Sequence, residues 1–222
     1  MFENQDLRTK VKICGLTNLE DARFVSGALV DYLGFIFFES SPRFIDPPKA
    51  GAIINWLEGP QSVGVFVNQS LDEVNDIAKQ TGIELVQLHG NESPDYCKLI
   101  DKPIIKVIHI EHNDTIESIN DRIKEYSDAV DFFMFDNKVG DQWGGTGQTF
   151  DWNVIKDMNL DLPFFLSGGL NSDNIEEAIE TVKPYAVDLS SSLEEVPGLK
   201  DFEKIEDFMD VMRSVWEQEE LG

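Results

Sequence analysis

Cysteines, basic residues and long apolar runs are all scarce in this chain of 222 residues, and each shortage excludes a class of protein. Its two cysteines, Cys14 and Cys97, lie far apart with no CxxC or histidine spacing around them, so neither a disulfide framework nor a zinc site is expected. No apolar run approaches membrane-spanning length, and the run from 29 to 38 is interrupted by Asp31. We therefore expect no membrane attachment.

Positive charge is also in short supply. Lysine and arginine total 18 against 42 aspartates and glutamates, which gives a formal net charge of −24. Nucleic acid is excluded as a partner because its phosphates would be repelled, and any site for an anionic metabolite must be locally positive. We attribute the acidity to solvated outer helices. The N-terminus is polar and acidic, unlike a signal peptide, so we expect a soluble, cytoplasmic protein.

Apolar runs alternate with amphipathic stretches at intervals of roughly 28 residues, which is typical of βα units. Strands are predicted at residues 11–15, 32–38, 62–68, 85–89, 104–110, 131–136, 164–167 and 186–190. Helices are predicted at 19–29, 47–57, 71–81, 94–100, 115–126, 152–158, 172–182 and 202–219, with Asn18, Ser70, Ser93 and Asn171 as N-caps. No linker divides the chain, so we predict an α/β fold of the (β/α)8 TIM-barrel type, of the kind that binds ribulose phosphates, as one domain over residues 1–222.

The carboxyl ends of barrel strands carry the chemistry of this fold, and two of them end in reactive side chains. Cys14 follows the first strand, and its thiol needs only a modest downward pKa shift to act as a base. Asp136 follows the sixth strand after four apolar residues, which would raise its pKa and keep it a proton donor. A buried, inert Cys14 and a capping Asp136 are the alternatives. Their joint placement favours an acid–base pair.

Other polar residues at strand ends suggest ligand binding. Small residues at Gly168-Gly169 and at 190–192 follow two neighbouring strands and predict a phosphate cup, with helix N-termini directly after it. Arg43 could clamp a carboxylate or form a surface ion pair with Glu39 or Asp46. His89 is predicted to be a hydrogen-bonded core residue, and Lys12 to pair inside the barrel with Asp188. The glycine-rich segment 137–149 suggests a mobile lid.

Several motifs together resemble the phosphoribosylanthranilate isomerase family of tryptophan biosynthesis. The most specific are Lys-Ile-Cys-Gly at 12–15 and Gly-Gly-Thr-Gly at 144–147 followed by Phe-Asp-Trp at 150–152. Further matches are Ser-Pro-Arg at 41–43, Gly-Val-Phe-Val-Asn at 64–68, Gln-Leu-His-Gly at 87–90, Gly-Gly-Leu at 168–170, Val-Asp-Leu-Ser-Ser at 187–191 and Pro-Gly-Leu-Lys-Asp at 197–201. They occur in the right order over nearly the whole chain.

The resemblance implies an enzyme without cofactor or metal. Its reaction would be the Amadori rearrangement of N-(5'-phosphoribosyl)anthranilate to 1-(2-carboxyphenylamino)-1-deoxyribulose 5-phosphate. Asp136 would be the general acid that opens the sugar ring, and Cys14 the general base that removes the C2' proton. Arg43 would bind the anthranilate carboxylate. The phosphate would be held by Gly145, Gly168, Gly169, Ser191 and Ser192. The implied partner is the small-molecule substrate, and the chain would be a monomer or a homodimer.

One position departs from the family pattern, which usually has glycine where this chain has Ser192. Serine keeps the backbone N–H but loses unstrained access to positive φ, so we expect phosphate binding with altered geometry. Three alternatives stay open. A histidine-pathway isomerase would carry aspartate at Cys14 and a second Gly-Gly motif in the N-terminal half, which is absent. A phosphate-binding protein would use Cys14 only for packing. Indole-glycerol-phosphate synthase would need a lysine at a strand end, and Lys106 lies within a predicted strand.

Overall fold

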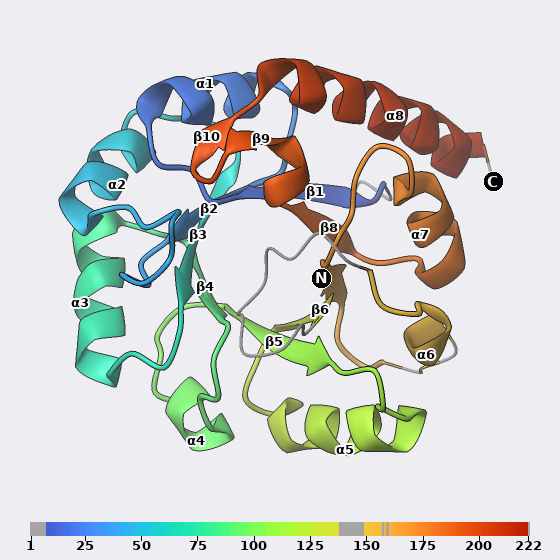
Figure 1. Cartoon of the computed structure of the whole chain (residues 1–222). Helices are drawn as coiled ribbons and strands as arrows, with labels where there is room; N and C mark the ends of the chain where they lie inside the picture. The colour runs from blue at the N-terminus through green and yellow to red at the C-terminus, as the bar shows by residue number, and fades with distance from the viewer. Residues whose placement is uncertain (1–7, 138–148, 157, 159, 222) are drawn as a thin grey trace.

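The computed structural model describes residues 8–137, 149–156, 158 and 160–221, and its strands form a closed barrel surrounded by helices (Figure 1). The barrel strands are parallel and follow each other in sequence order: β1 (Lys10–Cys14), β2 (Tyr32–Ile36), β3 (Gln61–Phe66), β4 (Leu85–Leu88), β5 (Ile104–Ile110), β6 (Phe132–Asn137), β7 (Phe164–Leu166) and β8 (Ala186–Leu189). β1 pairs with β8 and closes the ring. The predicted TIM barrel is confirmed.

The helices that surround the barrel alternate with its strands. They are α1 (Leu19–Gly27), α2 (Pro47–Ile54), α3 (Leu71–Thr81), α4 (Pro94–Cys97), α5 (Ile116–Tyr126), α6 (Asn153–Lys156), α7 (Ile175–Val182) and α8 (Phe202–Leu221). Asn18, Ser70 and Ser93 cap α1, α3 and α4 as predicted, each accepting a bond from a first-turn backbone N–H. The prediction for Asn171 is wrong, because α7 begins later and its N-cap is Asn174.

Side chains inside the barrel form two distinct layers. An apolar layer lies toward the amino ends of the strands and includes Tyr32, Met134 and Phe165. Because side chains alternate along a strand, the residue two positions after Met134 also points inward, one layer nearer the carboxyl ends. That residue is Asp136, and by the same rule Asp188 follows Ala186. The interior of the barrel is therefore apolar toward the amino ends of the strands and polar toward their carboxyl ends.

A β-hairpin that was not predicted follows β8. It consists of β9 (Glu194–Val196) and β10 (Leu199–Lys200), and one 3₁₀ turn, η1 (Ser191–Leu193), precedes it. The expectation of a helix starting directly after residues 190–192 is therefore wrong, as is the one after Gly169, because α7 begins at Ile175. Figure 1 places the hairpin beside α1 and over the end of β1. The segment between β7 and α7 and the segment between β8 and β9 both lie at the carboxyl face of the barrel, where loops can form a site.

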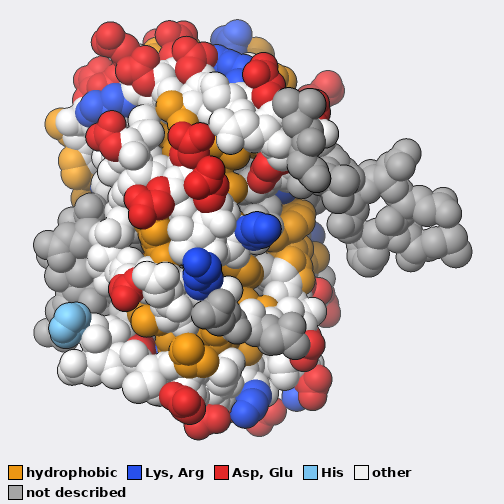
Figure 2. Space-filling view, turned by 90° about the vertical axis from the view of Figure 1, so that its right-hand side faces the viewer, with side chains coloured by type: hydrophobic (Ala, Val, Ile, Leu, Met, Phe, Trp, Pro, Cys, Tyr) orange, Lys and Arg blue, Asp and Glu red, His pale blue; other side chains and the backbone are white. Residues whose placement is uncertain are grey.

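The surface shows the excess of acidic over basic residues that the composition gives. Asp and Glu side chains are spread over the face shown in Figure 2, with few Lys or Arg among them. The described helices include none that is both long enough and apolar enough to cross a membrane.

Candidate active site

Asp136 lies in a cavity at the carboxyl face of the barrel, where β6 delivers it. The cavity has a volume of about 410 Å³ and is also lined by Gly168, Gly169, Asp188 and residues 190–192. Asp136 is 4% exposed. Burial, with a smaller contribution from the neighbouring Asp188 charge, raises the pKa of Asp136 to about 7. The predicted rise in the pKa of Asp136 is confirmed, and its role as a proton donor stays a prediction.

Lys12 and Asp188 form a buried ion pair beside this cavity. They face each other in the register of β1 and β8, and Lys12 Nζ donates to Asp188 Oδ1 over 2.7 Å. Lys12 is fully buried, so the predicted internal pairing is confirmed. Burial lowers the pKa of Lys12, but Asp188 and Cys14 together outweigh burial and raise that pKa, so the side chain is an ammonium ion. Its charge also acts on Cys14 and Asp136.

Cys14 ends β1 two residues after Lys12, and the charge of the Lys12 side chain acts on its thiol. It is 5% exposed, and its sulfur lies against β2 so closely that a Cβ on Gly34 would come within 2.6 Å of it. The expectation of a lowered thiol pKa is wrong for this structure. Burial raises the pKa of Cys14, and the nearby Lys12 and Lys200 charges only partly offset it. The thiol is therefore the prevailing form.

The two glycines after β7 adopt the conformation that only glycine takes easily. Their φ angles are +90° for Gly168 and +69° for Gly169. A Cβ on Gly168 would lie 2.8 Å from the Asn137 backbone nitrogen and 3.0 Å from Asp136 Oδ1. Asn174 at the start of α7 fixes this turn by donating to the Gly169 carbonyl over 3.0 Å. The turn thus brings bare backbone to the cavity beside the acid.

Ser191 and Ser192 form the other wall of the cavity, within the 3₁₀ turn after β8. Outside glycine, positive φ in the described ranges occurs only at Leu29, Asn68 and Lys183. Ser192 therefore carries no left-handed strain, and the loss of glycine is absorbed by the turn. Gly145, the remaining predicted phosphate residue, and the rest of the predicted lid from 138 to 148 lie outside the described residues.

Arg43 lies at the same face but pairs with a residue that the sequence analysis did not single out. Its Nε and Nη2 donate to both carboxylate oxygens of Glu194 over 2.7–3.0 Å. Neither Glu39 nor Asp46, the predicted alternatives, is its partner. Its stem passes over Gly15, where a Cβ would come within 2.7 Å of Arg43 Cδ. Arg43 is therefore held directly beside the end of β1, next to Cys14.

His89 is a second neighbour of Asp136 that spacing alone did not reveal. Its inward, buried position is confirmed: Nδ1 lies 3.2 Å from Gln87 Nε2. In addition, its Nε2 lies 3.5 Å from Asp136 Oδ2. Burial and the nearby His109 hold the pKa of His89 well below its usual value, so the ring is neutral. His89 thus borders the acid without adding charge.

The chain resembles one known protein family over most of its length. The family model described as N-(5'phosphoribosyl)anthranilate (PRA) isomerase matches residues 11–211. The N-(5'-phosphoribosyl)anthranilate isomerase of Petrotoga mobilis is 42% identical over 207 residues, covering 93% of this chain and 98% of that protein. The chain belongs to the PRA isomerase family.

Solved structures of PRA isomerases have the same architecture. The enzyme from Thermotoga maritima is 36% identical, with a TM-score of 0.84 over 93% of this chain and 99% of that one. A PRA isomerase in complex with reduced 1-(o-carboxyphenylamino)-1-deoxyribulose 5-phosphate is 34% identical, with a TM-score of 0.80 over the same shares. The compound carries a carboxylate and a phosphate, the two anionic groups for which the present site was predicted.

One group of side chains in this PRA isomerase family member has the composition of a metal site. Within the described ranges, ligand atoms of His89, His109 and Asp136 all lie within 4.8 Å of one another. Tetrahedral zinc would hold such atoms about 3.5 Å apart. His109 uses Nε2 in a 2.9 Å bond to the His89 carbonyl, and His89 is fixed by Gln87. We interpret the group as the surroundings of Asp136.

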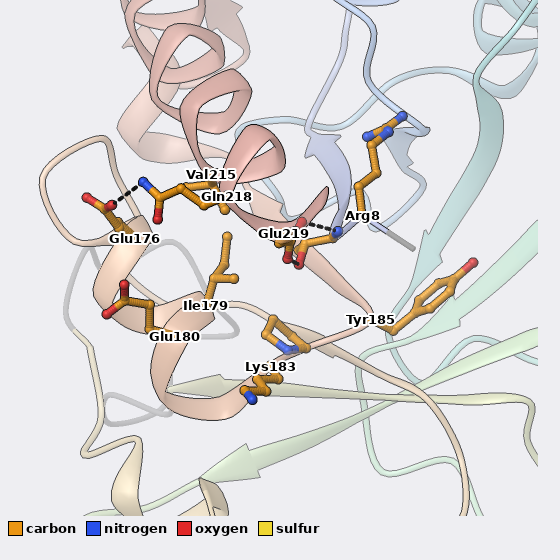
Figure 3. A pocket seen from close by; sticks show the side chains of 11 residues that line it. Arg8, Glu176, Ile179, Glu180, Lys183, Tyr185, Val215, Gln218 and Glu219 are labelled. Carbon is orange, nitrogen blue, oxygen red and sulfur yellow. Dashed lines mark hydrogen bonds between the residues drawn. The ribbon is translucent and has the colours of Figure 1, made fainter. Parts of the chain in front are cut away.

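A second cavity, of about 460 Å³, lies between α7 and α8 at the amino ends of β1 and β8 (Figure 3). It contains none of the predicted site residues. Two of its three carboxylates are engaged: Glu219 accepts bonds from both the backbone and the hydroxyl of Thr9, and Glu176 accepts one from Gln218. The catalytic site of a barrel lies at the opposite face, so this cavity has no part in the chemistry.

Proposed function

We propose that the chain catalyses the Amadori rearrangement of N-(5'-phosphoribosyl)anthranilate to 1-(2-carboxyphenylamino)-1-deoxyribulose 5-phosphate, the isomerase step of tryptophan biosynthesis. The observation that carries the proposal is a carboxyl group with a pKa of about 7, buried at the wall of a glycine- and serine-lined cavity. Cys14 approaches the same region from β1, with the Lys12–Asp188 pair linking the two. Membership of the PRA isomerase family supports the substrate assignment.

Asp136 is the general acid in this proposal. Its carboxylic acid donates a proton to the furanose ring oxygen, the bond from that oxygen to C1' breaks, and the anthranilate nitrogen becomes a protonated Schiff base. Cys14, as thiolate, then removes the proton from C2'. The electron pair of the broken C2'–H bond forms a C1'=C2' double bond while the π pair of the Schiff base moves to the nitrogen, which gives an enolamine that tautomerises to the ketose. Two proton transfers by positioned side chains account for the isomerisation.

Asp136 and Cys14 must carry one proton between them for the reaction to begin. Asp136 has to carry it and Cys14 has to lack it, although the Cys14 pKa is the higher one. The reactive arrangement is therefore the less populated form of the singly protonated pair. The buried Lys12 ammonium stabilises the thiolate in that form, because its charge lowers the Cys14 pKa against the effect of burial.

Binding of the two anionic ends of the substrate is divided between two parts of the site. The phosphate lies on the backbone of Gly168, Gly169, Ser191 and Ser192, with Gly145 completing its surroundings, and the carboxylate lies on Arg43. Positive φ at the two glycines supports this assignment, because it leaves backbone N–H groups accessible beside the cavity. The net negative charge of the chain makes such local donors necessary.

The decisive experiment compares variants in an auxotroph that lacks this isomerase and in purified form. Cys14→Ala and Asp136→Asn should each abolish rescue and lower kcat by about 10²- to 10⁴-fold, the usual range for a lost general base or acid. Binding of the reduced product should persist in both. Cys97→Ala, at the other buried cysteine, and Asp101→Asn, at an exposed carboxyl, are the matched controls. A phosphate-binding protein without enzymatic function would be indifferent to all four changes.

We further propose a cytoplasmic, single-domain protein that is a monomer or a homodimer. Both cysteines are free thiols, which suits a reducing compartment. Fractionation of cells and sedimentation of the purified chain test the two statements separately.

A further inference from the structure

The strongest polar network outside the reacting groups surrounds Glu194. This residue begins β9, directly after the turn that lines the cavity, and its side chain is 3% exposed. One carboxylate oxygen accepts from Arg43 Nε over 2.9 Å and from Lys200 Nζ over 2.9 Å, and the other accepts from Arg43 Nη2 over 2.7 Å. Burial alone would raise the pKa of Glu194, yet Arg43 and Lys200 lower it, so the group is a carboxylate.

Lys200 extends the network to the ends of two barrel strands. Its fully buried Nζ also donates to the carbonyls of Cys14, over 2.7 Å, and of Ser190, over 3.3 Å. Three donors thereby meet three acceptors, which satisfies an ammonium group completely. The hairpin register places Lys200 opposite Glu194, so the hairpin delivers both residues together. Glu194 is thus tied to the strand that carries the base and to the segment that leads into the phosphate turn.

Glu194 holds one edge of the Arg43 guanidinium group in place. A guanidinium group donates through Nε and both terminal nitrogens, and Glu194 occupies Nε and Nη2. Within the described part of the chain, Nη1 makes no hydrogen bond. The stem also packs closely on Gly15, where a Cβ would come within 2.7 Å of Arg43 Cδ. One edge of the group is therefore fixed, and the other is left for a ligand.

We propose that Glu194 is a positioning residue that holds Arg43 so that Nη1 binds the carboxylate of the substrate. The proposal rests on the proposed function, because it takes anthranilate as the group that Arg43 meets. Glu194 and Lys200 together set the distance from this donor to Cys14 and to the phosphate turn. They act on which aromatic amine is accepted, and they touch none of the reacting atoms.

Charge alone predicts the opposite effect, which makes the idea testable. Arg43, Lys200 and Glu194 sum to one positive charge, so Glu194→Gln adds a net positive charge near the ligand. If Glu194 only moderated that charge, this variant would bind carboxylates more tightly. If it positions Arg43, the loss of the two-point contact frees the guanidinium, and carboxylate binding weakens.

The experiment uses two ligands and titration calorimetry on the full chain. One ligand is reduced 1-(2-carboxyphenylamino)-1-deoxyribulose 5-phosphate, and the other is the same compound with an unsubstituted phenyl ring. We expect Glu194→Gln to weaken binding of the carboxylated ligand by about tenfold or more, the scale of a lost charge-assisted bond. Binding of the ligand with the unsubstituted phenyl ring should weaken by less than about threefold. Glu195→Gln, at the exposed neighbouring carboxylate, should change neither. Steady-state kinetics should show the same split, a raised KM with kcat nearly retained.

A second variant covers the case in which Glu194→Gln fails to fold. Arg43→Lys keeps the charge but replaces the planar fork with donors on a single nitrogen, which cannot both hold Glu194 and present a donor at the position of Nη1. It should therefore lose the preference for the carboxylated compound as fully as Arg43→Ala does. Equal weakening of both ligands, or tighter binding of the first by Glu194→Gln, would overturn the positioning role. If Arg43→Ala itself leaves the preference intact, the assignment of Arg43 in the proposed function fails instead.

Discussion

Lys12 and Asp188 lie directly opposite each other in the β1–β8 register and share a 2.7 Å hydrogen bond inside the barrel. The pair closes the ring of strands where the first and the last meet. Its charges also act on both proposed reacting groups, Cys14 and Asp136. One ion pair therefore serves the fold and sets the electrostatics of the site.

Removing one partner of this pair should be strongly destabilising. Lys12→Met leaves the Asp188 carboxylate buried without its cation, which typically costs about 3–5 kcal/mol of unfolding free energy. Lys98→Met, at an exposed lysine, should cost less than about 0.5 kcal/mol. The double variant Lys12→Met/Asp188→Leu should recover most of the loss, since no unpaired charge remains. Urea unfolding measures all three, and an unchanged midpoint for Lys12→Met would contradict the assignment.

The raised pKa of Asp136 predicts a stability that depends on pH. Its pKa is about 7 in the folded chain and near 3.8 in the unfolded one, so folding favours the protonated form. The stabilisation is complete below the unfolded value and is lost as pH rises through about 7. Asp136→Asn mimics the neutral acid, and its gain in stability over wild type should reach at most about 4 kcal/mol above pH 7 and vanish near pH 4. A carboxyl carbon NMR titration with a midpoint near 4 would refute this.

Activity should follow the proton shared by Asp136 and Cys14. The reactive form carries one proton on the pair, so kcat/KM should rise with pH through about 7, as the doubly protonated form disappears. It should fall again above the Cys14 pKa, which burial places higher than the ordinary thiol value. Rates measured from pH 5 to 10 at constant ionic strength test this. If kcat/KM instead declined steadily from pH 6, the reactive form would not be the singly protonated pair.

The sequence was sufficient to predict most of the barrel, because alternation of apolar and amphipathic segments determines where strands and helices form. It also placed Lys12 opposite Asp188, since both are polar residues expected to point into a closed sheet. The third and fourth strands were predicted too long, because the structure ends them at Phe66 and Leu88, before Asn68 and His89. The hydrophobic pattern of a segment does not show at which residue its hydrogen bonds to the neighbouring strands end.

What escaped prediction depends on contacts between distant segments. Glu194 is 151 residues from Arg43, and its hairpin is too short for a periodicity to reveal it. The Cys14 pKa was misjudged for a related reason. Sequence shows the cations that would lower it, but the degree of burial that raises it arises only from packing against β2.

The turn after β7 makes a prediction about glycine. Gly168→Ala places a Cβ at positive φ and 2.8 Å from the Asn137 nitrogen, so it should destabilise the chain by about 1–3 kcal/mol and weaken binding of inorganic phosphate. Gly27→Ala is the matched control, because its Cβ would meet nothing within 4 Å at the end of α1. It should be neutral or stabilising by up to about 1 kcal/mol. Equal effects of the two changes on phosphate affinity would argue against the turn as a phosphate site.

Ser192 tests whether the departure from the family's glycine matters. Its φ lies outside the left-handed region, so Ser192→Gly relieves no strain. The backbone N–H stays in place, and the affinity for inorganic phosphate should change by less than about threefold, which corresponds to roughly 0.6 kcal/mol. Glycine also adds freedom to the unfolded chain, so stability should fall by about 0.4–1 kcal/mol. Phosphate binding a hundredfold tighter in Ser192→Gly would mean that serine distorts the turn, and that the cavity wall at η1 is strained in wild type.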